Sequence, residues 1–215
     1  MAMIGTKPAG RPGTRRMVIA AMVVAVVAAI ALDTTVVRIG STDDLRQQAF
    51  DPDAFGRTEF PRIRGVVLDR APDAPTLAAE LAADKKAAIA AHGTMAGAFP
   101  VMPVRFTGVA GTGRSGIFTV DVPDMPDGMT VRVQTGPAIN GTELRDVPGD
   151  ISFGAFTNQI EYQDAGAGIN RAMAAEVLSG IDRDALTGKT ISATGVFTMI
   201  NPKSWLVTPV SLEVR

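Results

Sequence analysis

The stretch VMPVRFTGVAGTGRSGIFTVDV, residues 101–122, decides the fold class, because its apolar side chains recur with the two-residue period of a β-strand. Within 101–110, valine and phenylalanine alternate with arginine and threonine, as in a strand with one buried face. Residues 111–116 then form a glycine-rich turn, and 117–122 resume the alternation. The sequence therefore predicts an antiparallel hairpin.

The turn at 111–116 also satisfies the pattern G-x-G-x-x-G of nucleotide-binding loops. Such a loop must lead from a strand into a helix, whose N-terminus receives the phosphate. Here the loop leads into the strand 117–122 instead. We therefore interpret it as a hairpin turn and predict no cofactor.

The rest of the C-terminal half continues in short elements. A turn at 126–128 precedes a third strand, and a helix with one apolar side ends at Gly180. The predicted elements after the hairpin are a strand at 129–135, a helix at 164–178 and strands at 190–200 and 206–214. This order, strand-strand-strand-helix-strand-strand, is typical of a five-stranded OB-like barrel with the helix plugging one end. An open five-stranded sheet gives the same order, so the prediction is a β-rich α+β fold with both forms open.

A helical preface is predicted before the β domain. Residues 74–92 read as one alanine-rich helix with Thr76 as N-cap and Gly93 just past its end. Upstream lie a short β-like run at 36–39, a brief helix reaching Phe50, and a proline- and charge-bearing segment at 51–71 whose large apolar residues suggest docking. The predicted domains are a basic segment at 1–16, an apolar helix at 17–32, the preface at 33–98 and the β domain at 99–215.

The apolar run at 17–32 predicts export, since all four basic residues before it hold that end in the cytoplasm. Its sixteen residues fall between the lengths of a signal core and a spanning helix. We predict a single-pass anchor that starts at Met17, passes Val24 and ends at Leu32, with the C-terminal domain in the periplasm or outside. The alternative is secretion after cleavage near Ala31, within the A-x-A pattern 29–31.

Composition excludes several functions. After Leu32 the chain carries 17 basic and 22 acidic residues, a net charge of −5, which disfavours a nucleic-acid partner. Without cysteine there is no disulfide, thiolate chemistry or cysteine-ligated metal. The only histidine, His92, is predicted to end a helix and to interact with its dipole. We therefore predict no metal site and no catalytic residue.

Polar side chains gather between the third strand and the helix, in 136–162. Amides, carboxylates and an arginine could bind a small polar solute such as a sugar. The same groups could instead satisfy the backbone of buried turns, which is the interpretation we favour. The candidate ligand-binding residues are Asn140, Thr142, Glu143, Arg145, Asp146, Asn158, Gln159 and Tyr162.

Three segments carry a family resemblance: QTGPAINGTELRDVPGDISFGAFTNQIEY (134–162), LTGKTISATGVFTMINPKSWLVTPVSLEV (186–214) and VVRIGSTDDLRQQAFDPDAF (36–55). They resemble the predicted bacterial periplasmic lipoproteins of domain of unknown function 2291. The resemblance implies no established activity. Because members are often encoded beside sugar ABC transporters, it implies an accessory role in carbohydrate uptake. The matching positions are Gly141, Thr142, Leu144, Arg145, Asp146, Phe156, Asn158, Gln159 and Tyr162.

The sequence departs from that family at the lipid attachment site, where Asp33 stands in place of the lipidated cysteine. A lipid anchor at this position is impossible here, so a chain that needs the membrane would keep its apolar helix. This departure favours retention of residues 17–32 over cleavage.

The leading functional hypothesis is a non-enzymatic, membrane-tethered binding protein whose partner is a sugar ABC transporter or a small polar solute. The competing hypothesis is an envelope hydrolase that uses Glu143, Asp146 or Glu161, since glycoside hydrolysis needs two carboxylates. The two possible pairs, Glu143 with Asp146 and Glu161 with Asp164, are each three residues apart in turn-rich sequence, which exposure or capping explains better. A purely structural envelope domain is the third possibility.

Overall fold

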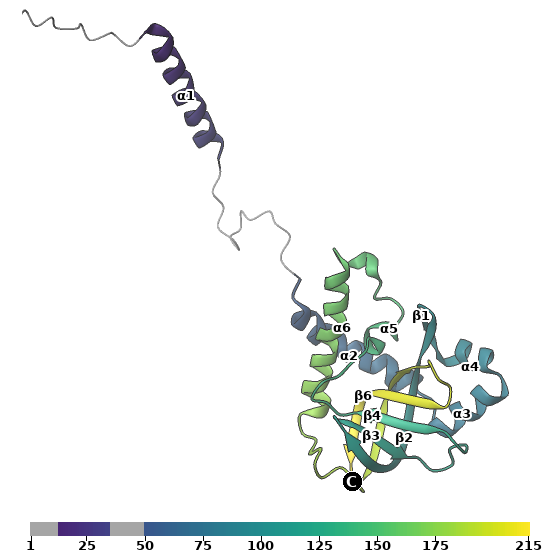
Figure 1. Ribbon diagram of the computed structural model, residues 1–215. Coiled ribbons are helices and arrows are strands. Elements are labelled where there is room, and N and C mark those ends of the chain that lie inside the picture. Colours follow the sequence, from purple (N-terminus) through teal and green to yellow (C-terminus); the bar gives the residue numbers. More distant parts are fainter. Residues whose placement is uncertain (1–12, 35–49) are drawn as a thin grey trace, which may run out of the picture. The chain divides into compact units, whose positions relative to one another are not determined.

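A computed structural model describes residues 13–34 and 50–215. The chain divides into two units, and the second, Phe50–Arg215, is compact (Figure 1). The predicted β-like run at 36–39 and the brief helix, up to Phe50, lie outside the described residues.

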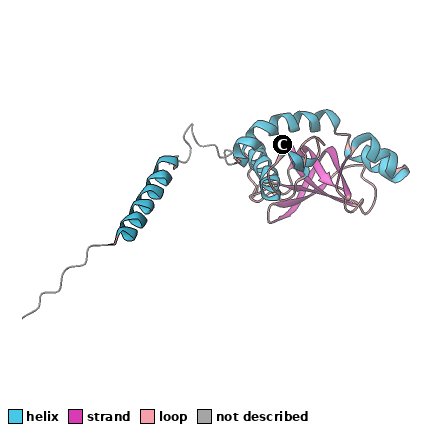
Figure 2. Ribbon diagram, turned by 90° about the horizontal axis from the view of Figure 1, so that it is seen from above, coloured by secondary structure: helices cyan, strands magenta, loops and turns pink. Residues whose placement is uncertain are grey.

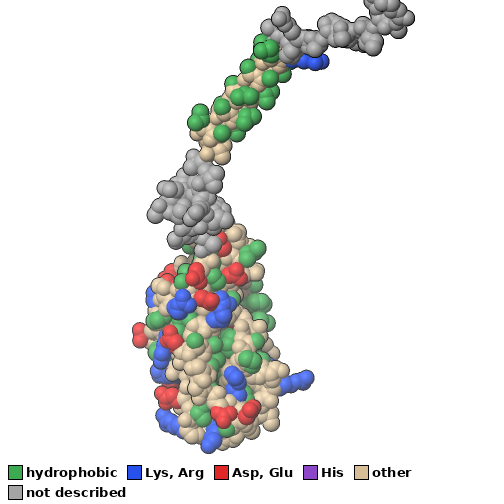
Figure 3. All heavy atoms as spheres, turned by 90° about the vertical axis from the view of Figure 1, so that its left-hand side faces the viewer, with side chains coloured by type: hydrophobic (Ala, Val, Ile, Leu, Met, Phe, Trp, Pro, Cys, Tyr) green, Lys and Arg blue, Asp and Glu red, His purple; other side chains and the backbone are tan. Residues whose placement is uncertain are grey.

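The first unit contains the helix α1, Thr14–Asp33. Among the described residues, Arg16–Asp33 is the stretch of helix long and apolar enough to cross a membrane. The space-filling view shows hydrophobic side chains along its visible surface (Figure 3), and Met17, Val24 and Leu32 are all exposed. Both a retained membrane anchor and a signal sequence are apolar helices of this kind.

Six strands form one sheet in the second unit, and its pairings run β1-β2-β3-β4-β6-β5. Strand β5 also pairs with β2, so the pairings from β2 through β3, β4, β6 and β5 return to β2, with β1 attached outside this ring. All neighbours are antiparallel except β4 and β6, which are parallel. The strands are β1 (Thr94–Ala96), β2 (Phe99–Arg114), β3 (Ile117–Asp121), β4 (Thr130–Gln134), β5 (Thr190–Thr198) and β6 (Ser204–Val214).

The five predicted strands are confirmed, and so is the hairpin turn. Strand β2 continues to Arg114, so only Ser115 and Gly116 separate it from β3, with positive φ angles of 52° and 74°. The alternation of apolar and polar residues did not predict β1, because this strand is only three residues long. The glycine-rich segment is therefore mostly strand.

Helices surround the strands (Figure 2). They share one hydrophobic core with the sheet, which contains both Phe60 of the helix at Pro52–Arg70 and Trp205 of β6. The Trp205 ring stacks on Phe197 of β5 at a centroid distance of 4.7 Å. The helical segments are α2 (Pro52–Arg70), α3 (Ala74–Ala83), α4 (Lys85–His92), α5 (Glu143–Asp146), the 3₁₀ turn η1 (Phe153–Ala155), α6 (Gln159–Met173) and the π-helical η2 (Ala174–Leu178).

The prediction of one helix at 74–92 is wrong. Asp84 is extended, with φ −148° and ψ 94°, and divides the segment into α3 and α4. Its Oδ1 accepts hydrogen bonds of 3.0 Å from the backbone N–H groups of Lys86 and Ala87, so it caps α4. Asp73, not Thr76, holds the N-cap position of α3.

Two further helix predictions differ from the structure. The segment at 51–71 is the nineteen-residue helix α2, capped by Asp51, whose carboxylate accepts from Asp53 and Ala54. Helix α6 begins at Gln159, five residues before the predicted start. His92 is the last residue of α4, as predicted, and its Nε2 lies 2.7 Å from a carboxylate oxygen of Glu80.

Helices α2 and α6 approach closely at two glycines. A Cβ atom on Gly56 would lie 2.2 Å from the carbonyl oxygen of Gly168, and one on Gly168 would lie 1.9 Å from that of Pro52. Both distances are shorter than any real contact, so only glycine fits. This crossing places Gly168, in the C-terminal half of α6, beside the first turn of α2.

Candidate binding site

Arg145 is the centre of the polar connection between β4 and α6. Only 7% of the residue is exposed, and its Nε donates to Oδ1 of Asp146 at 2.8 Å. Its Nη1 donates to the carbonyl oxygen of Tyr162 at 2.9 Å, and the guanidinium lies over the Tyr162 ring. Thr142 donates to the other carboxylate oxygen of Asp146 at 2.7 Å. A buried cation is thus held by a carboxylate, a carbonyl oxygen and an aromatic face.

The loop before α5 is fixed by Gln134, a buried residue of β4 that the sequence analysis did not single out. Its amide Nε2 donates to the carbonyl oxygen of Asn140 at 3.0 Å, and its Oε1 accepts from the Asn140 N–H at 3.1 Å. Nε2 also donates to Thr208 Oγ1 at 2.7 Å. Asn140 therefore contributes its backbone to this network.

Glu143 is half-buried beside β5, where the hydroxyl of Thr198 donates to its Oε1 at 3.2 Å. Burial raises the pKa of Glu143 above its ordinary value of 4.5, and the nearby charge of Asp146 adds to the increase. A carboxyl of this kind is a typical candidate acid. However, the neighbouring carboxylate of Asp146 is held by Arg145 and Thr142.

Asn158, Gln159 and Glu161 belong to the start of α6. The side chain of Asn158 accepts from the Glu161 N–H at 2.9 Å, and Glu161 accepts from the Thr157 N–H at 2.9 Å. Asn158 thus caps α6, and Glu161 reaches back to the residue before the N-cap rather than to the N-cap N–H of a capping box. Gln159 lies exposed in the first turn.

The structure thus brings Thr142, Arg145, Asp146 and Tyr162 together and bonds them to one another. Mutual hydrogen bonding of this kind supports the structural interpretation of the connection. Ligand binding by the eight candidate residues stays a prediction.

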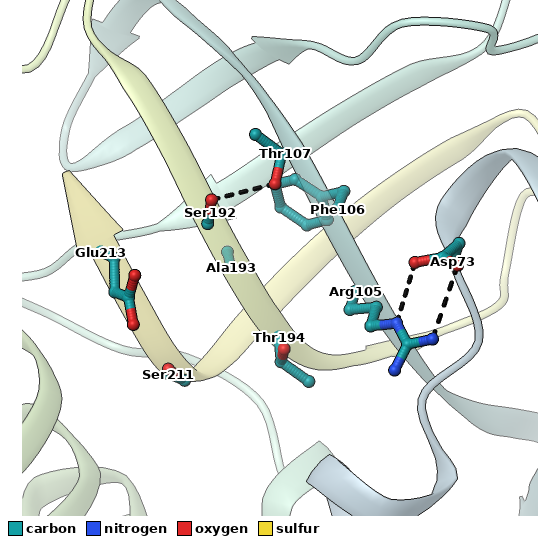
Figure 4. Close-up of a pocket in the computed structure, with 9 residues that line it drawn as sticks. All are labelled: Asp73, Arg105, Phe106, Thr107, Ser192, Ala193, Thr194, Ser211 and Glu213. Carbon is teal, nitrogen blue, oxygen red and sulfur yellow. Dashed lines mark hydrogen bonds and ion pairs between the residues drawn. The ribbon is translucent and has the colours of Figure 1, made fainter. Parts of the chain in front are cut away.

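A different polar surface lies on the outer face of β2, β5 and β6 (Figure 4). It is a shallow hollow of about 210 Å³. Its lining residues are Asp73, Arg105, Phe106, Thr107, Ser192, Ala193, Thr194, Ser211 and Glu213. We call it the hydroxyl hollow, because four of these side chains end in a hydroxyl group.

The register of the sheet arranges its polar side chains in two rows of three. Residues directly opposite on neighbouring strands point to the same side. Arg105 of β2 lies opposite Thr194 of β5, and Thr194 opposite Ser211 of β6. The second row contains Thr107, Ser192 and Glu213.

Two contacts hold this grid in place. Arg105 Nε donates to Asp73 Oδ1 at 2.8 Å, and this bond lowers the pKa of Asp73 and raises that of Arg105. Thr107 and Ser192 share a hydrogen bond of 2.9 Å between their hydroxyls. Each hydroxyl retains a further donor or acceptor capacity toward solvent.

The chemistry of the hydroxyl hollow suits a neutral ligand with several polar groups. Four hydroxyls can each donate and accept, and the carboxylate of Glu213 adds an acceptor. Among residues 13–34 and 50–215, no group of three or more histidine, aspartate or glutamate side chains is arranged to hold a metal ion. The sequence indicated that Arg105 and Thr107 lie on the outward face of one strand. Only the register of the sheet shows that β5 and β6 place their hydroxyls beside them.

A family model described as "Predicted periplasmic lipoprotein (DUF2291)" matches residues 21–213. The chain belongs to this family. The match confirms the resemblance carried by the three segments quoted above, and it begins inside α1. The description assigns no biochemical function. Membership and the apolar helix together fit a membrane-associated protein that faces the periplasm.

A solved structure shares the fold of this member. It is the crystal structure of an OB-fold protein from Thermotoga maritima, with a TM-score of 0.61 and 16% sequence identity, covering 78% of this chain and 100% of that one. At this identity the likeness shows the fold alone, and it supports the predicted OB-like topology. A comparison with curated proteins finds no match.

Proposed function

We propose that the protein is a non-enzymatic binding protein, held at the membrane by α1, whose hydroxyl hollow takes a small, neutral, polar solute. The observation that carries this proposal is the grid of Thr107, Ser192, Thr194 and Ser211 on three paired strands. Rows of hydroxyls at the strand spacing can bond successive polar groups of one ligand.

The strand pairings support a rigid platform for this site. We interpret the ring β2–β3–β4–β6–β5 as a closed OB-type barrel, because the β2–β5 pairing leaves these strands without an open edge. The two rows of the hollow lie across the β2–β5 and β5–β6 pairs of that ring. Sites built on strands are held more rigidly than sites on loops.

A polyhydroxylated solute fits this chemistry better than an anion, since Arg105 is paired with Asp73 and Glu213 is itself negative. A sugar is therefore the first class to test. The accessory role in sugar uptake that the family resemblance implies is part of this proposal, with a membrane transport protein as the partner.

The raised pKa of Glu143 would suit a catalytic acid, but the neighbouring carboxylate of Asp146 is bonded to Arg145 and Thr142. Glu143 itself accepts from Thr198, and Glu161 accepts from the backbone N–H of Thr157, just before α6. The purely structural alternative predicts that no solute changes the stability of the protein.

The test is a thermal-shift measurement on the full chain in detergent micelles, against separate sets of neutral sugars, polyols, amino acids and anions. Binding raises the free energy of unfolding by about 2.7 kcal/mol at a ligand concentration of one hundred times Kd. The double variant Ser192→Val, Thr194→Val should lose the shift that a neutral polar compound produces. Thr119→Val, an exposed threonine on β3, is the matched control.

No stabilisation by any compound, or an equal shift in the double variant, would remove the proposal. The transport role is tested separately, by pulling down membrane proteins with the full chain. If no transport protein co-purifies, that role fails while solute binding stands.

A further inference from the structure

Five aromatic rings form a continuous cluster at the start of the compact unit. Phe50, Phe55 and Phe156 lie mutually within 5.6 Å of one another, measured between ring centroids. Tyr162 lies 5.4 Å from Phe156 and 5.8 Å from Phe153. The chain has nine phenylalanines, one tryptophan and one tyrosine, so nearly half of its aromatic residues gather here.

This cluster lies at the surface. Phe153 is 49% exposed, while Phe50, Phe156 and Tyr162 are half-buried and Phe55 packs partly buried against the core. Ile160, in the first turn of α6 between Phe156 and Tyr162, is 70% exposed. We call these five rings and Ile160 the aromatic surface. Exposed apolar side chains that cluster in this way mark an interaction site.

The chain enters the compact unit at the aromatic surface, because Phe50 is both its first residue and a member of the cluster. Helix α1 ends at Asp33, so sixteen residues, 34–49, connect the two. Sixteen residues span at most about 55 Å when fully extended. Any membrane that holds α1 is therefore within reach of this surface.

We propose that the aromatic surface lies against the lipid bilayer that holds α1, with Phe153 and Ile160 in the interfacial region. This inference rests on the proposed retention of α1 as an anchor. Aromatic rings and apolar side chains partition into the membrane interface, where the tyrosine hydroxyl stays hydrated.

The charges nearby indicate which lipids take part. Asp51 accepts backbone hydrogen bonds that lower its pKa, so it is ionised, and Asp53 is paired with Arg171 at 2.6 Å. Arg57 lies near Asp51 and Arg171 pairs with Asp53, so these four groups offer no net positive charge to anionic lipid headgroups. The contact is therefore apolar, and it should form on neutral phosphatidylcholine and be insensitive to salt.

The cysteine-free chain permits a direct test with single labels. The full-length variant Ile160→Cys carries a polarity-sensitive fluorophore and is reconstituted into phosphatidylcholine vesicles containing lipids with a quencher at the headgroup or shallow chain. The control is Val214→Cys, 41% exposed near the C-terminus, which Figure 1 shows at the opposite end of the compact unit from the start of α6. Val24→Cys, near the middle of α1, reports on insertion of α1 in parallel vesicles whose lipids carry the quencher deep in the acyl chain.

The expected result is quenching at position 160 at least roughly twofold greater than at position 214, unchanged by salt, since interfacial burial brings the label to the quencher. Adding Phe153→Ser should reduce it. Emission of the buried Trp205 checks that each variant is folded.

Three outcomes would overturn the proposal. Quenching at position 24 with equal, low quenching at 160 and 214 means that α1 is inserted but the aromatic surface is not at the membrane. A label at 160 that is shielded from water without lipid quenching identifies a protein partner or a second copy instead. Absence of quenching at all three positions rejects the anchor itself, and this inference with it.

Discussion

The guanidinium carbon of Arg145 lies 3.6 Å from the centroid of the Tyr162 ring, while Nη1 of the same side chain bonds the Tyr162 carbonyl oxygen. Tyr162 of α6 thus contacts the guanidinium twice: its ring lies against the flat face, and its carbonyl oxygen accepts from an N–H at the edge. Asp146 balances the charge at 2.8 Å. This contact fastens the short helix α5 to α6, and through α6 to α2.

Arg145→Ala should lower the free energy of unfolding by roughly 3 kcal/mol, because it leaves the carboxylate of Asp146 partly buried and unpaired. Arg145→Lys keeps the charge but loses the planar fork and much of the stacking, for a cost of about 1 kcal/mol. Urea denaturation followed by Trp205 fluorescence measures both. Equal stability of the wild type and the alanine variant would contradict this account of the connection.

Two glycine substitutions in α2 should change the free energy of unfolding in opposite directions, because only one of the glycines lies at the crossing with α6. Gly56→Ala should destabilise the protein by roughly 2 kcal/mol, because its Cβ would overlap the backbone of Gly168. Gly65→Ala, also in α2 but with open space around its Cβ, should stabilise by about 0.5 kcal/mol. Thermal unfolding of the two variants distinguishes them. Two shifts of the same sign would be inconsistent with the close crossing.

Asp84 separates α3 from α4, and its replacement tests why the helix breaks there. Asp84→Ala should cost about 1 kcal/mol, since two backbone N–H groups lose their acceptor. Asp84→Asn keeps a capping oxygen and should cost much less. Denaturation curves provide the comparison, and an asparagine variant as unstable as the alanine variant would show that capping is not the reason.

Glu143 gives a pH dependence with a defined sign. Because its folded pKa is raised, its contribution to stability is fully present below the ordinary value of 4.5 and is lost as the pH rises through the folded value. Glu143→Gln removes this contribution. The wild type should therefore lose stability relative to the variant between pH 4.5 and neutral. Parallel stability curves in urea across this range would show that burial does not raise the pKa.

Most strands could be predicted from sequence because each has one buried face. Val104 and Phe106 alternate with Arg105 and Thr107, and this period is visible within a single segment. Two features were not visible: the parallel pairing of β4 with β6 and the return pairing of β2 with β5. Both join segments far apart in the chain, so no local pattern specifies them.

Helix α2 was missed because its local signals oppose a helix. Pro61, Gly56 and Gly65 interrupt the helical pattern, and each lowers helix propensity. Tertiary packing overrides them: Phe60, Ile63 and Val67 are fully buried on one side of the helix. In contrast, the alanine-rich segment at 74–92 favours a helix throughout. The break at Asp84, which ends α3 and caps α4, was therefore not predicted.

The sequence indicated the polar connection but not the state of its groups. Burial of Arg145 and its bonds to Asp146 and Tyr162 depend on how α5 meets α6. The hydroxyl hollow was missed because its residues come from three strands. Thr107, Ser192 and Ser211 are ordinary outward residues in their own segments, and only the sheet register gathers them.

The central claim is that the hydroxyl hollow binds a neutral polar solute, and native mass spectrometry of the protein isolated from its own membranes tests it most directly. The account predicts a bound small molecule on the wild type that is lost in the Ser192→Val, Thr194→Val variant and kept in Thr119→Val. A wild-type protein that carries no solute from its membranes, or a molecule bound equally by all three proteins, would contradict it.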